Sequence, residues 1–169
     1  MSSRIDQQYL SFSLGTENYA LSISSVREVL ELSRLSKMPA SVPYFKGIID
    51  VRGKGIPVID MGMRLGLEEC VSRENKAVVV VEQQLTTGEV LSIGLLADSV
   101  HEVIWIREED IDPAPSIGNS MAWNFINGVG KIEDGFIFIL NLEKLLSEIE
   151  APVIPGEDIS GINSEELSE

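Results

Sequence analysis

The sequence of 169 residues contains one cysteine and one histidine, and this scarcity excludes several kinds of chemistry. A single cysteine, Cys70, cannot form an internal disulfide, which fits a reducing compartment. One cysteine and one histidine also fall short of the ligand set of a typical zinc centre. We interpret His101, which lies between a valine and a glutamate, as an exposed polar side chain of a strand. The acidic run 108–112 lacks the glycine and the terminal glutamate of a calcium loop. We therefore predict no metal site and no catalytic residue.

Basic residues are scarce as well. The chain has 13 Lys and Arg against 27 Asp and Glu, a formal net charge of −14. Nucleic acids and anionic membrane surfaces both require clustered basic side chains, so neither is expected as a primary partner. The longest apolar runs, 77–81 and 136–140, are far shorter than the roughly 20 residues of a transmembrane helix. The N-terminus lacks the basic and apolar regions of a signal peptide. We expect a cytoplasmic protein that does not insert into the membrane.

The glycine-containing motifs do not match those of nucleotide-binding enzymes. No Walker-type loop and no nucleophile elbow is present. Gly-Val-Gly-Lys at 128–131 begins like a dinucleotide fingerprint, but the third glycine is missing and a strand pattern follows. Gly-Lys-Gly at 53–55 lies between two predicted strands and fits a hairpin turn. These features predict a protein that is not an enzyme and has no cofactor.

What the sequence does contain is a series of strand-like segments. Residues 9–14 and 19–23 alternate between apolar and polar around a turn, which predicts a hairpin. Only 142–149 has helical spacing, with Asn141 as a candidate cap. A proline-rich loop is predicted at 112–116. Further strands are predicted at 26–32, 47–51, 56–60, 77–82, 90–96, 103–106 and 135–142.

An internal repeat organises these strands. Ser-Val-Arg-Glu-Val at 25–29 returns as Ser-Val-His-Glu-Val at 99–103, 74 positions later. The segment 56–61 aligns with 137–142 at an offset of 81. The repeat predicts two similar β units, which we expect to close into barrels because closure removes exposed strand edges. Chance similarity between short apolar strands is the alternative.

The repeat and the composition together suggest a domain organisation. We predict one domain over residues 1–150, with two interleaved barrel subdomains of roughly 8–70 and 71–149. Residues 151–169 are rich in carboxylates and contain no Lys or Arg, so we expect them to form an acidic disordered tail.

Arg52 is the first candidate for a binding role. The segment Asp50-Val51-Arg52-Gly53 ends a predicted strand and places an acid and an arginine on one face. Arginine offers a planar five-donor fork and is enriched in interface hot spots. The alternative is a surface ion pair with Asp50, a type of interaction that contributes little to stability.

The valine-rich segment that begins at Val26 is the second candidate. Val26 and Val29 are three positions apart and therefore face opposite sides of a strand. One of them must point out of its own barrel, toward the other barrel or a partner. Glu28 and its repeat counterpart Glu102 are interpreted as strand residues facing solvent.

The sequence resembles the CheW family of bacterial chemotaxis coupling proteins from about residue 8 to 149. The most specific segment is Phe-Lys-Gly-Ile-Ile-Asp-Val-Arg-Gly at 45–53. The resemblance is also carried by segments 12–15, 19–23, 26–29, 57–60, 97–103, 128–130 and 142–146.

The resemblance implies an all-β fold of two SH3-like five-stranded β-barrels, packed across a hydrophobic seam with a groove between them, and a short C-terminal helix. It also implies a non-catalytic adaptor that joins chemoreceptor signalling tips to the regulatory domain of the histidine kinase CheA. The alternatives are a small-ligand sensor or enzyme that uses the groove, and an adaptor of a non-flagellar chemosensory system.

The family's functional motifs fall on identifiable positions of this chain. The arginine-glycine motif for receptor and kinase coupling matches Arg52 and Gly53, and the valine-x-glutamate segment beside the receptor groove matches Val26 and Glu28. The family often has asparagine where this chain has Asp50. That departure, the 112–124 loop and the acidic tail leave the receptor partner open. The predicted partner-binding residues are Val26, Glu28, Val29, Asp50, Arg52 and Gly53.

Overall fold

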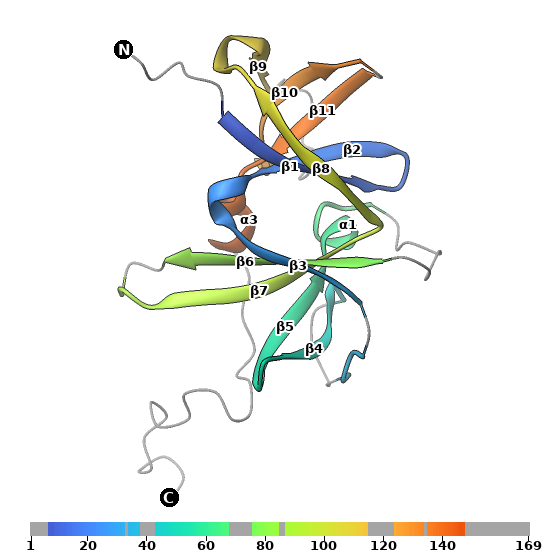
Figure 1. Cartoon of the computed structure of the whole chain (residues 1–169), viewed down its shortest axis with the longest axis vertical. Coiled ribbons are helices and arrows are strands. Elements are labelled where there is room, and N and C mark those ends of the chain that lie inside the picture. The colour runs from blue at the N-terminus through green and yellow to red at the C-terminus, as the bar shows by residue number, and fades with distance from the viewer. Residues whose placement is uncertain are drawn as a thin grey trace, which may run out of the picture.

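The computed structural model describes residues 7–32, 34–37, 43–67, 76–84, 87–114, 124–133 and 135–147. These residues form two β-sheets, one above the other in the view of Figure 1, with two short helices between them. The strands are β1 (Gln7–Leu14), β2 (Glu17–Ser22), β3 (Val26–Glu31), β4 (Phe45–Val51), β5 (Lys54–Asp60), β6 (Ala77–Gln84), β7 (Val90–Ala97), β8 (Ser99–Ile106), β9 (Ile111–Pro113), β10 (Ile126–Ile132) and β11 (Gly135–Leu140). The helices are α1 (Met61–Arg64) and α3 (Leu142–Ser147), and two 3₁₀ turns lie at Ile23–Ser25 and Glu108–Asp110.

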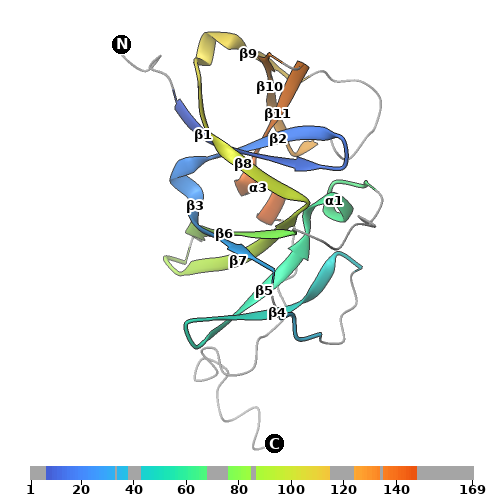
Figure 2. The same cartoon turned by 45° about the vertical axis from the view of Figure 1, so that its right-hand side comes forward.

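The two sheets correspond to the two predicted barrels. The upper barrel has the strand order β8-β1-β2-β11-β10-β9, and the lower barrel has the order β3-β6-β7-β5-β4. Neither barrel is built from one repeat alone, because each takes strands from both halves of the chain (Figure 2). The all-β prediction is confirmed, with the addition of a sixth short strand, β9, in the upper barrel.

Strand β9 corrects the prediction of a loop at 112–116. Asp112 pairs with Val129 and Pro113 with Gly128, so both belong to the sheet. A proline fits there because β9 is the last strand of the sheet, where a missing N–H breaks no ladder. Residues 115 and 116 lie outside the described residues, as do residues 148–169, which include the predicted tail.

The sequence repeat reappears in the pairing of the strands. In β3 the three steps from Val26 to Val29 lie opposite two steps of β6. In β8 the three steps from Val100 to Val103 likewise lie opposite two steps of β1. Each strand therefore has a bulge at the same point, 74 positions apart in the sequence. The offset reflects one strand plan used twice.

The core has three layers, which explains why some strands are apolar on both faces. In β6, Val79 and Val81 face the seam between the barrels, whereas Val78 and Val80 face the interior of the lower barrel. A strand buried on both sides needs a continuous apolar run, as at 77–81. The upper interior is smaller and contains Tyr9, Ala20, Ile106, Ile137 and Ile139. The buried seam combines both barrels and both helices, with Leu10, Phe12, Leu21, Ile59, Met61, Leu95, Leu140 and Leu145 among its members.

The two helices begin at equivalent capped positions. The Asp60 carboxylate accepts a hydrogen bond from the Met63 backbone N–H at 3.1 Å, which caps α1. The Asn141 side-chain oxygen accepts one from the Lys144 N–H at 3.0 Å, which caps α3 as the sequence predicted. Since Asn141 is 81 positions after Asp60, the helices follow the repeat as well.

Arg64 ties the two helices together. It is buried at the end of α1, and its guanidinium donates to the Leu145 carbonyl of α3 at 3.3 Å. The guanidinium carbon lies 4.5 Å from the ring centroid of Phe125 and 5.2 Å from that of Tyr44. Tyr44 and Phe125 are themselves 81 positions apart. Equivalent positions of the two repeats therefore each place an aromatic ring against the Arg64 guanidinium.

Two glycines in equivalent bulges leave room for a neighbouring backbone. A Cβ at Gly47 would lie 2.4 Å from the Ser36 carbonyl oxygen, and a Cβ at Gly128 would lie 2.8 Å from that of Asp112. Ser36 bridges Ile48 as Asp112 pairs with Val129. Both barrels therefore need a glycine where an additional chain segment crosses the bulge.

Gly47→Ala and Gly128→Ala are each expected to lower the free energy of unfolding by about 1–3 kcal/mol, because the new methyl group meets backbone that cannot move aside. Thermal unfolding followed by circular dichroism measures the loss. Gly88→Ala is the control for backbone strain alone: its φ of +96° disfavours alanine, but nothing lies within 4 Å of the added Cβ, so its loss should be smaller. Equal losses for all three variants would contradict the crowding argument.

Two buried tyrosines predict a loss of stability in alkaline solution. Burial raises the pKa of Tyr9 and Tyr19 above the ordinary value, and the charges of Glu108 and Glu17 add to the respective shifts. The stabilisation is complete below about pH 10, the pKa of an unfolded tyrosine, and is lost as the pH rises toward the folded-state pKa. Urea unfolding at several pH values above 8 should show this decline. Tyr19→Phe should make the decline shallower, and an unchanged slope would contradict the assignment.

Candidate functional site

The β4–β5 turn places Arg52 in an unusual backbone conformation. Val51 pairs with Lys54, which leaves Arg52 and Gly53 as a two-residue turn with φ of +53° and +84°. Positive φ at both positions is the pattern of a type I′ turn, which favours Asn-Gly and disfavours long side chains. Among the described residues, Arg52 is the only non-glycine residue with positive φ. The turn thus holds an arginine where local preference opposes one, which often marks a functional position.

Asp50 supports this turn. Its carboxylate accepts a hydrogen bond from the Gly53 backbone N–H at 2.8 Å. The alternative interpretation, an Arg52–Asp50 ion pair, is wrong: Asp50 bonds the turn backbone, and Arg52 pairs with another residue. An asparagine at position 50 offers the same acceptor oxygen, so the departure from the family pattern preserves the hydrogen bond.

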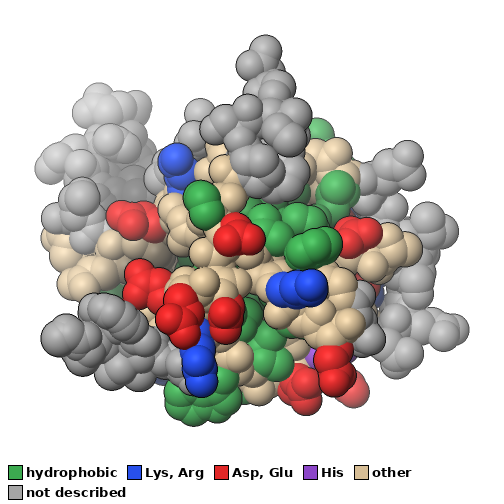
Figure 3. Space-filling view, turned by 90° about the horizontal axis from the view of Figure 1, so that it is seen from above, with side chains coloured by type: hydrophobic (Ala, Val, Ile, Leu, Met, Phe, Trp, Pro, Cys, Tyr) green, Lys and Arg blue, Asp and Glu red, His purple; other side chains and the backbone are tan. Residues whose placement is uncertain are grey.

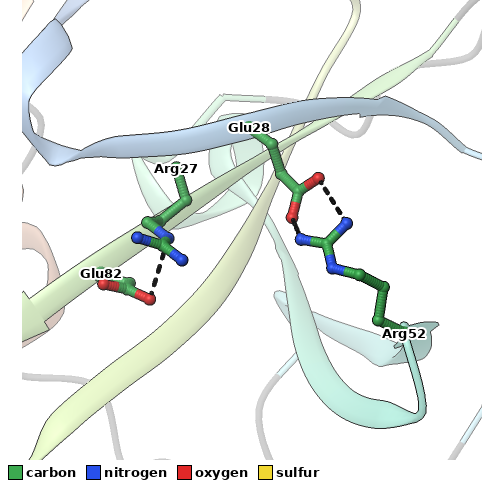
Figure 4. A network of polar contacts seen from close by, with 4 residues as sticks. All are labelled: Arg27, Glu28, Arg52 and Glu82. Atoms are coloured by element: carbon green, nitrogen blue, oxygen red, sulfur yellow. Dashed lines mark hydrogen bonds and ion pairs between the residues drawn. The ribbon is translucent and has the colours of Figure 1, made fainter.

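Glu28 of β3 is the partner of Arg52. The two terminal guanidinium nitrogens donate to the two carboxylate oxygens, Nη1 to Oε1 at 3.2 Å and Nη2 to Oε2. Figure 4 shows the two side chains pointing toward each other from β3 and the turn. The hydrogen bond to Glu28 and the charge of its carboxylate raise the pKa of the Arg52 guanidinium above its ordinary value. Glu28 is at the surface, as expected for a polar strand residue, but it is paired with Arg52, which the sequence did not indicate.

The exposure of this pair suits recognition better than stability. The Arg52 side chain is 72% exposed and the Glu28 side chain 24%. Exposed ion pairs contribute little to folding, but a bidentate pair fixes the direction of the guanidinium plane. The pair therefore displays a pre-oriented arginine at the surface.

The two candidate valines of β3 differ in burial. Val26 is half-buried and packs against the seam, whereas Val29 is 41% exposed. The expected opposite orientation of the two valines is wrong, because the bulge between them cancels the alternation. Val26 lies opposite Val81 and Val29 opposite Val79, and both of these β6 residues face the seam. Glu28 and Arg52 are paired at the surface, and we call these two residues the β3–turn surface. Val29 follows Glu28 in the strand and faces the opposite side.

Sequence reasoning missed a second ion pair on the same strand. Arg27 Nε lies 3.2 Å from a carboxylate oxygen of Glu82 on β6, and Figure 4 shows both side chains beside the Glu28–Arg52 pair. The sequence places opposite charges at these two positions in separate predicted strands. Predicting the ion pair would have required knowing that β3 pairs with β6.

The described part of the chain gives no sign of metal or membrane chemistry. No group of three or more His, Cys, Asp or Glu side chains in it is placed to hold a metal ion. None of its helices has the length and apolar character needed to cross a bilayer. Cys70 lies outside the described residues.

Comparison with known proteins decides the family. The family model for the CheW-like domain matches residues 8–150. The chain belongs to the CheW-like family. A probable chemotaxis protein CheW of Rhizobium etli is 30% identical over 146 residues, covering 86% of this chain and 91% of that protein. A chemotaxis protein CheW of Klebsiella aerogenes is 28% identical over 150 residues, covering 89% and 87%.

A solved structure supports the CheW-like fold directly. The crystal structure of the scaffolding protein TtCheW from Thermoanaerobacter tengcongensis matches with a TM-score of 0.74 and 33% identity. The match covers 89% of this chain and 99% of that one. This CheW-like chain is a non-catalytic chemotaxis scaffold with the two-barrel fold, as the sequence predicted.

Proposed function

We propose that this CheW-like chain is a cytoplasmic adaptor that couples chemoreceptor signalling tips to the regulatory domain of the histidine kinase CheA. The observation that supports this proposal is the β3–turn surface, where Glu28 holds an exposed Arg52 in a fixed orientation. The arginine retains further N–H donors for a partner's acceptor groups, because a guanidinium has five.

The strand beside this arginine strengthens the proposal. β3 is an end strand in the sheet order of the lower barrel, and it carries the exposed Val29 on the face opposite to Glu28. The unpaired backbone groups of an end strand and an exposed apolar side chain are both features that a partner can cover. We assign Val26, Glu28, Val29, Asp50, Arg52 and Gly53 to partner binding, with Asp50 and Gly53 shaping the turn and Val26 joining the strand to the seam.

Reconstitution tests the proposed function. Receptor-containing membranes, purified CheA and the full chain are mixed, and the kinase that sediments with the membranes is measured together with its phosphorylation rate. We expect the chain to raise both quantities. If CheA and receptors do not bind the chain at micromolar concentration, the proposal is wrong.

The alternative of a small-ligand sensor has its own test. A ligand that binds the native state with dissociation constant Kd raises the stability by RT ln(1 + [L]/Kd). A panel of common metabolites should leave the melting temperature unchanged. A strong shift by one of them, without binding to CheA or receptors, would favour the sensor.

A further inference from the structure

The upper barrel contains a hollow that the proposed function does not use. Its volume is about 570 Å³, and its wall is formed by β1, β2, β8, β10, β11 and the β10–β11 turn. The polar lining residues are Ser11, Asn18, His101, Glu102 and Glu133, and three isoleucines supply the apolar wall. Figure 3 looks onto this end of the molecule, where acidic side chains predominate over basic ones.

The internal repeat shows what such a site accepts. Glu102 is the counterpart of Glu28 at the offset of 74, and Glu133 is the counterpart of Arg52 at the offset of 81. In the lower barrel the Arg52 guanidinium is bound by both carboxylate oxygens of Glu28. In the upper barrel the position equivalent to Arg52 is occupied by Glu133, so a second carboxylate replaces the arginine. The lower barrel provides its own cation, whereas the residues lining the upper hollow include no lysine or arginine.

The backbone of Glu102 is held in place by a contact that the lower barrel does not have. The buried Ser11 hydroxyl donates to the Glu102 carbonyl at 2.9 Å and accepts from the Glu102 N–H at 3.3 Å. In the lower barrel the residue opposite Glu28 is Val80, which has no hydroxyl to make these bonds. Ser11 thus fixes the strand from which Glu102 faces the hollow.

We infer that this hollow binds the guanidinium group of an arginine side chain presented by a partner protein. Two carboxylates can accept the planar donor fork, and the isoleucines can pack against the methylene stem. An arginine within a polypeptide fits better than free arginine, because the free amino acid would bring a charged α-ammonium and a charged α-carboxylate that must lose water beside the isoleucine wall. The inference does not depend on CheA or a receptor being the partner.

The test uses the full chain labelled for NMR and three probes. The probes are acetyl-Gly-Arg-Gly-amide, the same peptide with neutral citrulline in place of arginine, and free arginine. The arginine peptide should shift the resonances of Ser11, His101 and Ile132, with a dissociation constant on the order of 1 mM. The citrulline peptide should bind at least about tenfold more weakly because it lacks the charge. Free arginine should also bind at least about tenfold more weakly, because its two charged α groups would have to be desolvated.

Two variants complete the experiment. Glu133→Arg should reproduce the internal pairing of the lower barrel and abolish peptide binding, and Glu133→Gln should weaken it with less change to the barrel. Glu31→Gln, an exposed position on β3 of the other barrel, removes one carboxylate as Glu133→Gln does and should leave peptide binding unchanged. The inference is overturned by no binding of the arginine peptide, by equal binding of citrulline or free arginine, or by full binding to both Glu133 variants.

Discussion

Arg52→Glu is expected to weaken binding of a receptor-tip fragment, of the CheA regulatory domain or of both by roughly 30-fold or more if the arginine is desolvated at the contact, and by much less if it lies at the rim. The substitution removes the cation and places a second carboxylate beside Glu28. The fold should persist because the Arg52 side chain is 72% exposed. Isothermal titration against each partner gives the loss, and far-UV circular dichroism and melting curves check the fold.

Three further variants separate contact from other effects. Arg107→Glu makes the same charge change at an exposed arginine of the upper barrel, whose side chain is 62% exposed. Equal losses at both sites would indicate a general field effect and contradict a local contact. Arg52→Lys keeps the charge but loses the bidentate fork, so an intermediate loss is expected. The double reversal Glu28→Arg with Arg52→Glu restores an internal pair; recovery of binding would show that Arg52 only stabilises the turn.

Arg64→Ala is expected to lower the free energy of unfolding by about 3–4 kcal/mol, a decrease in melting temperature of roughly 10 °C. The variant leaves the buried Leu145 carbonyl without this donor, removes the cation between Phe125 and Tyr44, and opens a cavity. Thermal and urea unfolding of the full chain measure the effect.

Arg64→Met and Arg27→Ala are the matched controls. Methionine keeps most of the apolar volume but neither the charge nor the donors, so its loss should be smaller than that of alanine but still substantial. Arg27 is an exposed arginine in an ion pair, and its removal should cost little. If Arg64→Ala destabilises no more than Arg27→Ala, Arg64 does not hold the helices together.

The architecture was predictable because the positions of the apolar residues along the chain follow directly from the strands and the helix that bury them. The valine run of β6, the repeated Ser-Val-x-Glu-Val segment and the cap at Asn141 each follow from burial or backbone geometry that acts locally. The partner of Arg52 was not predictable in this way. Asp50 is near it in sequence and Glu28 is 24 positions away, yet the turn directs the arginine toward β3. β3 and the β4–β5 turn come from opposite ends of the sheet order, so the contact depends on the sheet closing on itself, which no local pattern reveals.

The hollow of the upper barrel was likewise beyond sequence reasoning. The opposite charges of Arg52 and Glu133 were visible from the repeat, but a void is a property of packed surfaces and leaves no pattern in the chain. His101, interpreted as an exposed strand residue, is exposed and lines this hollow. The roles of the six predicted partner-binding residues stay predictions until the titrations are made.

The interleaving of the two halves has a consequence for synthesis on the ribosome. The β1–β2 hairpin emerges first, but β8 and β11, the strands that pair with its two edges, are synthesised much later. Ala20, for example, pairs with Ile139. At about 5–20 residues per second, the hairpin spends several seconds with both edges uncovered. Pairing between such distant segments gives a high contact order, so folding is completed late and slowly. The nascent chain therefore passes through an interval in which its first strands are open to pairing with other chains.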